Sequence, residues 1–214
     1  MAKHFVLVSG NIAAGKTSLT RKLGARLEWE TAYESVDDNP YLADFYADMR
    51  SWAFYLQIFF LGNRAQQHMA LAKSEASAMI DRSIYEDAEI FARAALELGT
   101  VTDRDYSTYR QLFDLVVGLL PTPDLLIYLK APVPELMRRI RARRRDMEGG
   151  VTEDYLALLE KYYEQWIERF DLCPTLTIRT DDLDFVHRPG HLDIVVDRIK
   201  DKLAGKEEIA FPQG

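Results

Sequence analysis

The run GNIAAGKT, residues 10–17, has two glycines, a lysine and a threonine at the spacing G-x-x-x-x-G-K-[ST]. Backbone N–H groups of such a loop, with the N-terminus of the helix after it, surround phosphate oxygens. Lys16 would reach the outer phosphates, and the Thr17 hydroxyl is suited to Mg²⁺. An ordinary glycine turn is disfavoured, because a predicted strand precedes the loop and a predicted helix follows it. The expected phosphate-contacting residues are Gly10, Asn11, Ile12, Ala13, Ala14, Gly15, Lys16, Thr17 and Ser18.

The second substrate decides which reaction such a loop serves. The sequence has no N-K-x-D segment, which disfavours a GTPase-type switch that would read guanine through it. A kinase with a small acceptor remains. Phosphoryl transfer to such an acceptor needs cations around the moving group and a group that receives the acceptor proton.

Six arginines crowd residues 138–145, just before Gly149 and Gly150. Cations this close repel one another unless an anion neutralises their charge, so residues 138–150 are predicted to close over phosphates as a lid. Arg139 and Arg143 share one helical face by their spacing. The alternative is a solvated basic face paired with acidic residues, and it applies to some of the six.

Two carboxylates are candidates for the acceptor proton and the metal. Glu34 comes late in a predicted strand, where it can point toward the phosphate site and accept a proton, or can lie on the surface. Asp81 ends the next strand and can organise Mg²⁺ directly or through water, with Arg82 beside it. An Asp–Arg pair of this kind is also common as a structural ion pair.

The elements that must position these residues alternate along the chain. Predicted strands cover residues 5–8, 31–36, 79–81, 125–129 and 176–178, and predicted helices cover 16–27, 41–46, 51–73, 87–98, 103–120, 132–144, 152–170 and 192–203. Asp103 and Thr152 are the expected N-caps of two of these helices. Alternation predicts a single α/β domain over residues 1–214 with a parallel five-stranded sheet. The loop at Gly10, Glu34 and Asp81 then meet at the carboxyl edge of that sheet.

Composition narrows the partners. The formal net charge of −7 disfavours binding to nucleic acid, which draws on many uncompensated cations. The single cysteine, Cys173, cannot form an intramolecular disulfide, and no apolar run is long enough to span a membrane. We therefore expect a cytoplasmic protein with a small anionic ligand and no membrane partner.

Together these segments resemble the deoxyribonucleoside kinase family over nearly the whole chain. GNIAAGKT resembles its phosphate loop, AYESV around Glu34 its general base, and WAFYLQIFFLGNRAQ its substrate helix. DRSIYED resembles its E/D-R-S segment, RRIRARRRDMEGG its arginine lid, and TDDLDFV the loop that contacts the adenine of ATP. The resemblance implies a P-loop kinase fold that uses ATP and Mg²⁺ and forms a homodimer through a helix bundle.

The resemblance also implies a role for each matching position. Glu34 would accept the proton of the 5′-hydroxyl, Arg82 and Lys16 would stabilise the reacting groups, and Thr17 and Asp81 would lie near the metal. Residues that match the remaining positions fall into three groups. They are Tyr46 and Glu148 for the sugar, Gln57, Arg64 and Asp87 for the base, and Arg139, Arg143, Arg145, Asp182 and Phe185 for ATP.

The hydrogen-bonding groups at the base-contacting positions limit which nucleoside bases would fit. The Gln57 amide has one donor and one acceptor side, which suits an amino group next to a ring acceptor. Arg64 is two helical turns further on and shares its face, and Asp87 can hold the Arg64 guanidinium. We expect deoxyadenosine or deoxyguanosine as acceptor, with deoxycytidine also possible. A nucleoside monophosphate kinase and a non-catalytic nucleotide-binding regulatory protein remain the alternatives.

Overall fold

The computed structural model describes residues 3–33, 39–143, 150–181, 183, 185 and 188–205, except for the side chains of Tyr46 and Pro189. Within these residues five strands form one parallel sheet in the order β2-β3-β1-β4-β5. The strands are β1 (Phe5–Gly10), β2 (Glu30–Ala32), β3 (Ala78–Asp81), β4 (Leu125–Lys130) and β5 (Thr175–Arg179). The predicted parallel five-stranded α/β fold is confirmed.

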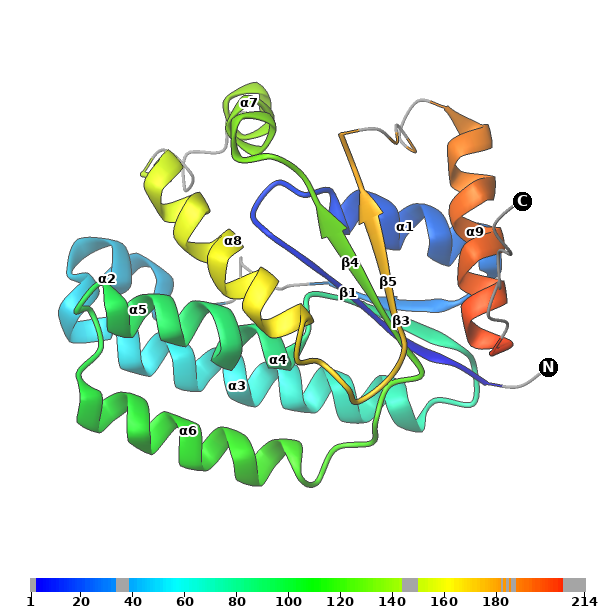
Figure 1. Cartoon of the computed structure of the whole chain (residues 1–214). Coiled ribbons are helices and arrows are strands. Elements are labelled where there is room, and N and C mark those ends of the chain that lie inside the picture. Colours follow the sequence, from blue (N-terminus) through cyan, green and yellow to red (C-terminus); the bar gives the residue numbers. More distant parts are fainter. Residues whose placement is uncertain are drawn as a thin grey trace, which may run out of the picture.

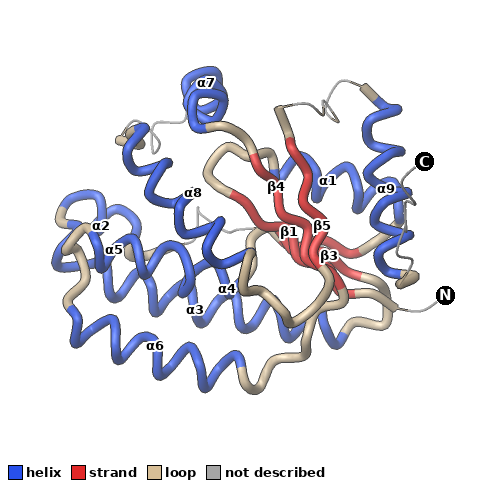
Figure 2. The backbone as a smooth tube through the Cα atoms, viewed as in Figure 1, coloured by secondary structure: helices blue, strands red, loops and turns tan. Residues whose placement is uncertain are grey.

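Helices cover both faces of the sheet (Figure 1). They are α1 (Lys16–Leu27), α2 (Leu42–Ala47), α3 (Met49–Lys73), α4 (Ile84–Glu86), α5 (Arg93–Glu97), α6 (Asp103–Val117), α7 (Val133–Arg143), α8 (Glu153–Ile167) and α9 (Pro189–Leu203). A π-helix, η1 (Asp87–Ala92), joins α4 to α5. Figure 2 shows the strands running side by side between the helical layers.

The buried strands explain these layers. Side chains alternate across β1, so Val6 and Val8 pack with α1, α7 and α9, whereas Phe5 and Leu7 pack with α3, α4, α6 and α8. All six residues of β1 are buried. A strand buried on both faces is an uninterrupted apolar run, and this is the pattern in FVLV.

Register brings the chemically important residues to one edge. Val8 of β1 lies opposite Asp81 of β3, and Gly10 lies opposite Leu129 of β4. Because all the strands are parallel, their carboxyl ends point toward the phosphate loop and α7 (Figure 1). The loop at Gly10, the turn after Asp81 and the residues after β5 are therefore neighbours.

Several local predictions differ from the structure. Asp103 was expected to cap α6, but the Thr102 side chain accepts from Asp105 N–H and is the N-cap, which places Asp103 in the first turn. The helix predicted over residues 87–98 begins three residues earlier and includes the π-helical turn η1. Thr152 caps α8, as predicted.

Among the residues that the structure describes, no helix is both long enough and apolar enough to cross a membrane.

Candidate active site

The phosphate loop connects β1 to α1, and its two glycines have backbone conformations that other residues rarely adopt. Gly10 has φ +146°, and a Cβ there would lie 2.5 Å from the Leu129 carbonyl oxygen. Gly15 has φ +104° immediately before α1. No side chain in the described part of the chain caps α1, so its first N–H groups face the loop without a side-chain acceptor. This arrangement suits an anion.

Lys16 lies folded across the mouth of this loop. Its side chain is largely buried, and its Nζ donates to the carbonyl oxygens of Gly10 at 2.7 Å and Asn11 at 2.9 Å. The ammonium group therefore lies against the loop that it is expected to serve. A phosphate oxygen entering the loop would be within reach of it.

Thr17 and Asp81 meet beside the loop. The Thr17 hydroxyl donates to Asp81 Oδ2 at 2.5 Å, and Asp81 is 3% exposed. Asp81 Oδ1 is buried and has no hydrogen-bond partner among the residues that the structure describes. A hydroxyl beside a carboxylate with an unused oxygen fits Mg²⁺, which takes few protein ligands and completes its shell with water and phosphate.

Arg82 follows Asp81 in a strained turn. Its φ is +73°, its N–H donates to the Val8 carbonyl at 2.9 Å, and its guanidinium lies 4.6 Å from the centroid of the Phe91 ring. Cation–π contact and burial hold the side chain at the carboxyl edge of the sheet. Sequence reasoning missed Phe91, because one phenylalanine in an apolar helix carries no signal of its own.

A second polar group comes from α3 and η1. Arg64 Nε lies 2.5 Å from Asp87 Oδ2, and both side chains are 4% exposed. The predicted Arg64–Asp87 pair is therefore confirmed. Gln57 lies two turns before Arg64 on α3, and its Oε1 is buried with no hydrogen-bond partner among the described residues. A buried, unsatisfied amide oxygen of this kind indicates a ligand that donates to it.

A cavity of about 590 Å³ opens on the other side of the loop. It also contains residues that were not singled out from the sequence, among them Arg21, Glu135 and Asp181. Phe185 is buried there, and its ring lies 3.3 Å from the position of a Cβ on Gly15. Eight residues predicted for ATP line the cavity, namely Ala13, Gly15, Lys16, Thr17, Ser18, Arg139, Arg143 and Phe185.

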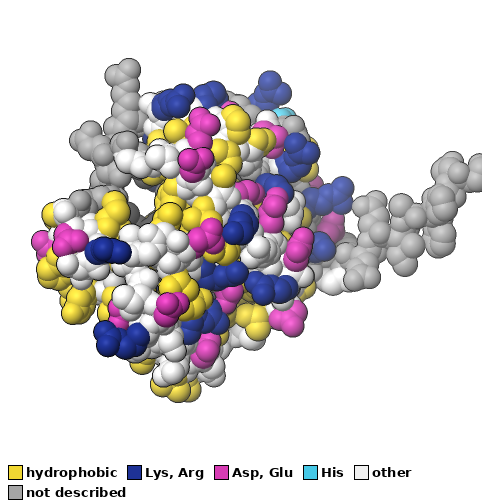
Figure 3. Space-filling model, turned by 60° about the vertical axis from the view of Figure 1, so that its left-hand side comes forward, with side chains coloured by type: hydrophobic (Ala, Val, Ile, Leu, Met, Phe, Trp, Pro, Cys, Tyr) yellow, Lys and Arg dark blue, Asp and Glu magenta, His cyan; other side chains and the backbone are white. Residues whose placement is uncertain are grey.

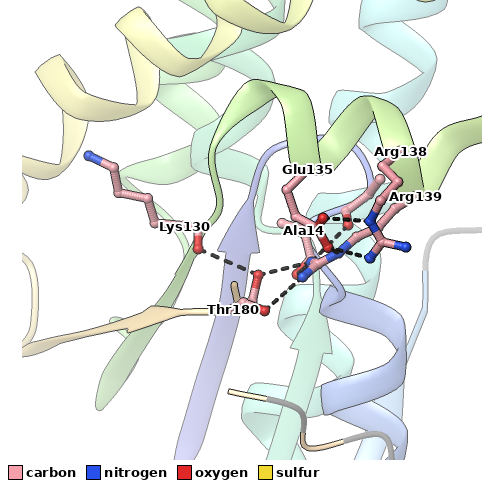
Figure 4. Close-up of polar contacts among 7 residues, drawn as sticks. Ala14, Lys130, Glu135, Arg138, Arg139 and Thr180 are labelled. Carbon is pink, nitrogen blue, oxygen red and sulfur yellow. Dashed lines mark hydrogen bonds and ion pairs between the residues drawn. The ribbon is translucent and has the colours of Figure 1, made fainter. Parts of the chain in front are cut away.

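Arg139 connects three parts of this cavity (Figure 4). Its Nη1 donates to Thr180 Oγ1 at 2.9 Å and more weakly to the carbonyls of Ala13 and Ala14, and its Nη2 donates to the Thr180 carbonyl at 2.7 Å. Its Nε donates to Glu135 at 2.7 Å. Arg139 thus ties α7 to the phosphate loop and to the end of β5.

Arg138, the neighbour of Arg139, has a different environment. Its side chain is 68% exposed, and its guanidinium donates to Glu135 through two hydrogen bonds of 2.7 Å. Hydrogen bonds from Arg138, aided by Arg139, lower the pKa of Glu135 to about 2. This pair is the solvated ionic contact that the sequence analysis expected for some of the arginines.

Five predicted site residues fall wholly or partly outside the part of the chain that the structure describes. Four of them are outside it entirely, and of the fifth, Tyr46, only the side chain is. The four are Glu34, Arg145, Glu148 and Asp182.

Comparison with known proteins agrees with this geometry. The family model described as "Deoxynucleoside kinase" matches residues 6–204. A deoxyadenosine/deoxycytidine kinase of Bacillus subtilis is 38% identical over 196 residues, which cover 91% of this chain and 90% of the relative. A deoxyguanosine kinase of Lactobacillus acidophilus is 38% identical over 207 residues, covering 92% and 90%.

A solved structure of a deoxyadenosine kinase from M. mycoides with bound dATP is also similar. It superposes with a TM-score of 0.79 at 26% identity and covers 92% of this chain and 99% of its own. The residues matched by the family model, 6–204, include the phosphate loop, the turn after Asp81, α3 and the residues that line the cavity. This chain belongs to the deoxynucleoside kinase family.

Proposed function

We propose that this protein transfers the γ-phosphate of ATP to the 5′-hydroxyl of a purine deoxyribonucleoside, deoxyadenosine or deoxyguanosine. Family membership over residues 6–204 supports the reaction, and relatives of more than 30% identity bear the names of deoxyadenosine, deoxyguanosine and deoxyadenosine/deoxycytidine kinases. The choice of acceptor rests on the buried Gln57 Oε1, which has no hydrogen-bond partner among the described residues and lies on α3 two turns before Arg64 of the buried Arg64–Asp87 pair.

The donor nucleotide occupies the loop and the adjoining cavity. Its phosphates accept from the loop N–H groups and from Lys16, which exchanges its carbonyl partners for phosphate oxygens. Arg143 and Phe185 line the cavity, and Arg139 holds α7 over it. Bound Mg²⁺, held near Thr17 and Asp81, would neutralise charge on the β- and γ-phosphates.

The base is held by α3 and η1. Gln57 Oε1 accepts from an exocyclic amino group while the Gln57 amide N–H donates to the neighbouring ring nitrogen, as on adenine N6 and N1. The Arg64–Asp87 pair presents fixed charge beside it, since both side chains are buried and hold each other. Thymine has a carbonyl where this set requires an amino group. Guanine also has a carbonyl there, at C6, so it would have to present its N2 amino group and the N3 ring acceptor to Gln57 instead.

The transfer itself needs a proton acceptor. β2 ends at Ala32, two residues before Glu34 in the sequence, and its carboxyl end lies at the same sheet edge as the loop. In the proposed step Glu34 takes the 5′-hydroxyl proton while that oxygen bonds to the γ-phosphorus. The bond from the γ-phosphorus to the β,γ-bridging oxygen breaks, and ADP leaves. Four cations neutralise the charge on the phosphoryl group in transfer, namely Lys16, Arg82, Arg143 and the predicted lid residue Arg145. The sugar 3′-hydroxyl is held by Tyr46 and Glu148.

We also propose a homodimer, with α3 and α6 forming its helix bundle. Three leucines at helical spacing on α6 and just after it are exposed, namely Leu112, Leu115 and Leu119 at 42%, 65% and 71%. A contiguous apolar face on a soluble protein marks an interaction surface. Figure 3 keeps α6 at the bottom of the molecule and shows hydrophobic side chains at that lower edge.

The test is a substrate panel with ATP and Mg²⁺. It contains the four deoxynucleosides, their ribose counterparts and their 5′-monophosphates, with product formation followed by chromatography. The proposal predicts the highest kcat/KM for deoxyadenosine or deoxyguanosine, with the 5′-monophosphate as product. Turnover of monophosphates alone would identify a nucleoside monophosphate kinase, and ATP binding without turnover of any acceptor would identify a regulatory protein.

A further inference from the structure

A buried carboxylate that the proposed reaction does not use lies beneath the phosphate loop. Glu86 is the last residue of α4, and its exposed fraction is 0%. It lies five residues after Asp81 and does not line the donor cavity. A carboxylate removed from water costs free energy unless hydrogen bonds replace its hydration, so its contacts are informative.

Four donors surround the Glu86 carboxylate. Oε2 accepts from Ser9 Oγ at 2.7 Å and from Ser83 N–H at 2.6 Å. Oε1 accepts from Gly10 N–H at 3.2 Å and from the Tyr163 hydroxyl at 2.6 Å. The donors belong to β1, the β3–α4 turn and α8, so one side chain joins three elements that are distant in sequence.

The two backbone donors, Gly10 N–H and Ser83 N–H, belong to the phosphate loop and to the turn that carries Arg82. Gly10 begins the phosphate loop, and its carbonyl oxygen accepts from Lys16 Nζ. Ser83 directly follows Arg82, whose backbone has a left-handed conformation that is strained for a residue other than glycine. Hydrogen bonds from Arg82 N–H to Val8 and from Ser83 N–H to Glu86 hold this turn on both sides.

Tyr163 secures the carboxylate from the side of α8. Its hydroxyl lies between Glu86 Oε1 and the Gly10 carbonyl, 2.9 Å from the latter. Burial first, and then the charge of Glu86, raise the pKa of Tyr163 well above its ordinary value of 10. The hydroxyl therefore keeps its proton and remains a donor.

We infer that Glu86 is a positioning residue that fixes the phosphate loop relative to Arg82, so that the γ-phosphate and the cation that stabilises its transfer meet in register. Glu86 acts through Gly10 and Ser83 and touches neither substrate. This inference rests on the proposed function. A displacement of about 1 Å between reacting groups is enough to lower a rate about 100-fold, so a fixed distance matters more here than added affinity.

The test is Glu86→Gln, which keeps the shape of the side chain. Each carboxylate oxygen accepts one backbone N–H, and an amide nitrogen cannot accept, so either orientation of the amide leaves Gly10 N–H or Ser83 N–H without its partner. We expect kcat to fall by about tenfold or more. The dissociation constants for ATP and for the nucleoside, each measured alone by calorimetry, should stay within about threefold, since each half keeps its own ligand contacts.

A stability control separates positioning from general loosening. Val196→Ala on α9 truncates a side chain that is 2% exposed on the opposite face of the sheet. It should lower the melting temperature while leaving kcat unchanged. The inference is overturned if folded Glu86→Gln retains kcat within about twofold of wild type, or if both dissociation constants rise while kcat stays unchanged.

If Glu86→Gln does not fold, two milder variants test the same role of Glu86. Ser9→Ala and Tyr163→Phe each remove one hydroxyl donor and leave both backbone donors in place. Each should lower kcat by about threefold to tenfold. Two folded variants with wild-type kcat would refute the inference.

The assays also separate the two proposals. Wild-type turnover of a purine deoxynucleoside with unimpaired Glu86 variants leaves the proposed function standing and removes the inference. A wild-type enzyme inactive on every nucleoside of the panel removes the proposed function, and the role of Glu86 with it.

Discussion

At the scale of single residues, the side chains that await a ligand differ from those that complete the fold. Gln57 Oε1 is buried and without a hydrogen-bond partner among the described residues, whereas Glu86 has four donors. Buried polar atoms are ordinarily satisfied, so an exception points to a missing partner. The purine amino group is the partner that we assign to Gln57.

Gln57→Leu should therefore impair use of the nucleoside. Loss of a paired donor and acceptor costs about 1–3 kcal/mol, which corresponds to a fall of about 5- to 150-fold in kcat/KM for deoxyadenosine. Steady-state kinetics at saturating ATP measure it. Gln66→Leu is the matched control, because Gln66 is exposed on the same helix. Equal kcat/KM for the two variants would contradict the assignment.

His68 makes a prediction about stability. It is 1% exposed on α3, bonds to the Pro121 carbonyl through Nε2 at 2.7 Å, and packs edge-on against Phe5. Burial lowers its pKa below the ordinary value of 6.5, so the unfolded chain binds this proton more readily than the folded protein. The stability gained from neutral His68 is complete above pH 6.5 and is lost as pH falls below it.

His68→Phe should flatten this dependence. Urea unfolding at pH 7.5, 6.5 and 5.5 gives the free energy of unfolding of each protein. We expect wild type to lose more of that free energy than the variant between pH 6.5 and 5.5. Parallel curves for the two proteins would show that His68 does not contribute to the pH dependence.

The phosphate loop could be predicted from residue spacing because its chemistry is local. The glycines, Lys16 and Thr17 are consecutive or nearly so, and the structure has them in the expected strand–loop–helix. Glu86 could not be predicted in this way. In DRSIYED it is one of three carboxylates, and only the fold determines that it points inward beneath Gly10.

Among the secondary-structure elements, α7 contains residues 138–143 of the predicted lid, and its two neighbouring arginines differ in role. Arg139 bonds to the loop carbonyls and to Thr180, whereas Arg138 bonds to Glu135 on its own helix. The contacts of Arg139 join α7 to the phosphate loop and to the end of β5, whereas the contact of Arg138 lies on the surface of α7. Exposed ion pairs of the second kind contribute little to stability.

Arg139→Ala should raise KM for ATP by about tenfold, because α7 loses its hydrogen bonds to the loop carbonyls and to Thr180. Arg138 lines the same cavity, but its side chain is 68% exposed and bonds to Glu135 on its own helix, so Arg138→Ala should change KM for ATP by less than about twofold. Initial rates over a range of ATP concentrations compare the two. If the Arg138 variant were the more impaired, the assignment of roles on α7 would be wrong.

Most helix positions could be predicted from apolar periodicity and caps, and the failures have physical reasons. The helix over residues 16–27 matches α1, and Thr152 caps α8. Periodicity did not predict the π-helical turn η1, because one wider turn leaves the apolar pattern nearly unchanged. Thr102 and Asp103 are both good caps, and side-chain geometry decides between them.

At the scale of the whole molecule, strand–helix alternation was enough to predict a parallel sheet. It was not enough to predict the order β2-β3-β1-β4-β5, because alternation does not say on which side of β1 each later strand is added. The Arg64–Asp87 pair, which joins α3 to η1, came from the family resemblance. Without the family resemblance, an ordinary structural ion pair is the favoured interpretation of these two residues.

The proposed dimer predicts a change of mass. Leu115→Glu with Leu119→Glu places two carboxylates on the exposed apolar face at α6 and should convert a dimer of about twice 24.6 kDa into a monomer. Light scattering coupled to size-exclusion chromatography, at micromolar concentration, measures both proteins. Ile194→Glu on α9 is the control, since Ile194 is 53% exposed away from α6. A wild-type monomer would refute the dimer.

In the proposed reaction, ATP and a neutral sugar alcohol meet at one edge of the sheet, and a carboxylate takes the proton of the alcohol. The decisive measurement is the kcat of Glu34→Gln with the best deoxynucleoside of the panel. The proposal predicts a fall of about 10²- to 10⁴-fold, with the dissociation constants for ATP and for the nucleoside little changed. A kcat within about twofold of wild type would contradict it, because an acceptor that is already an anion needs no such base.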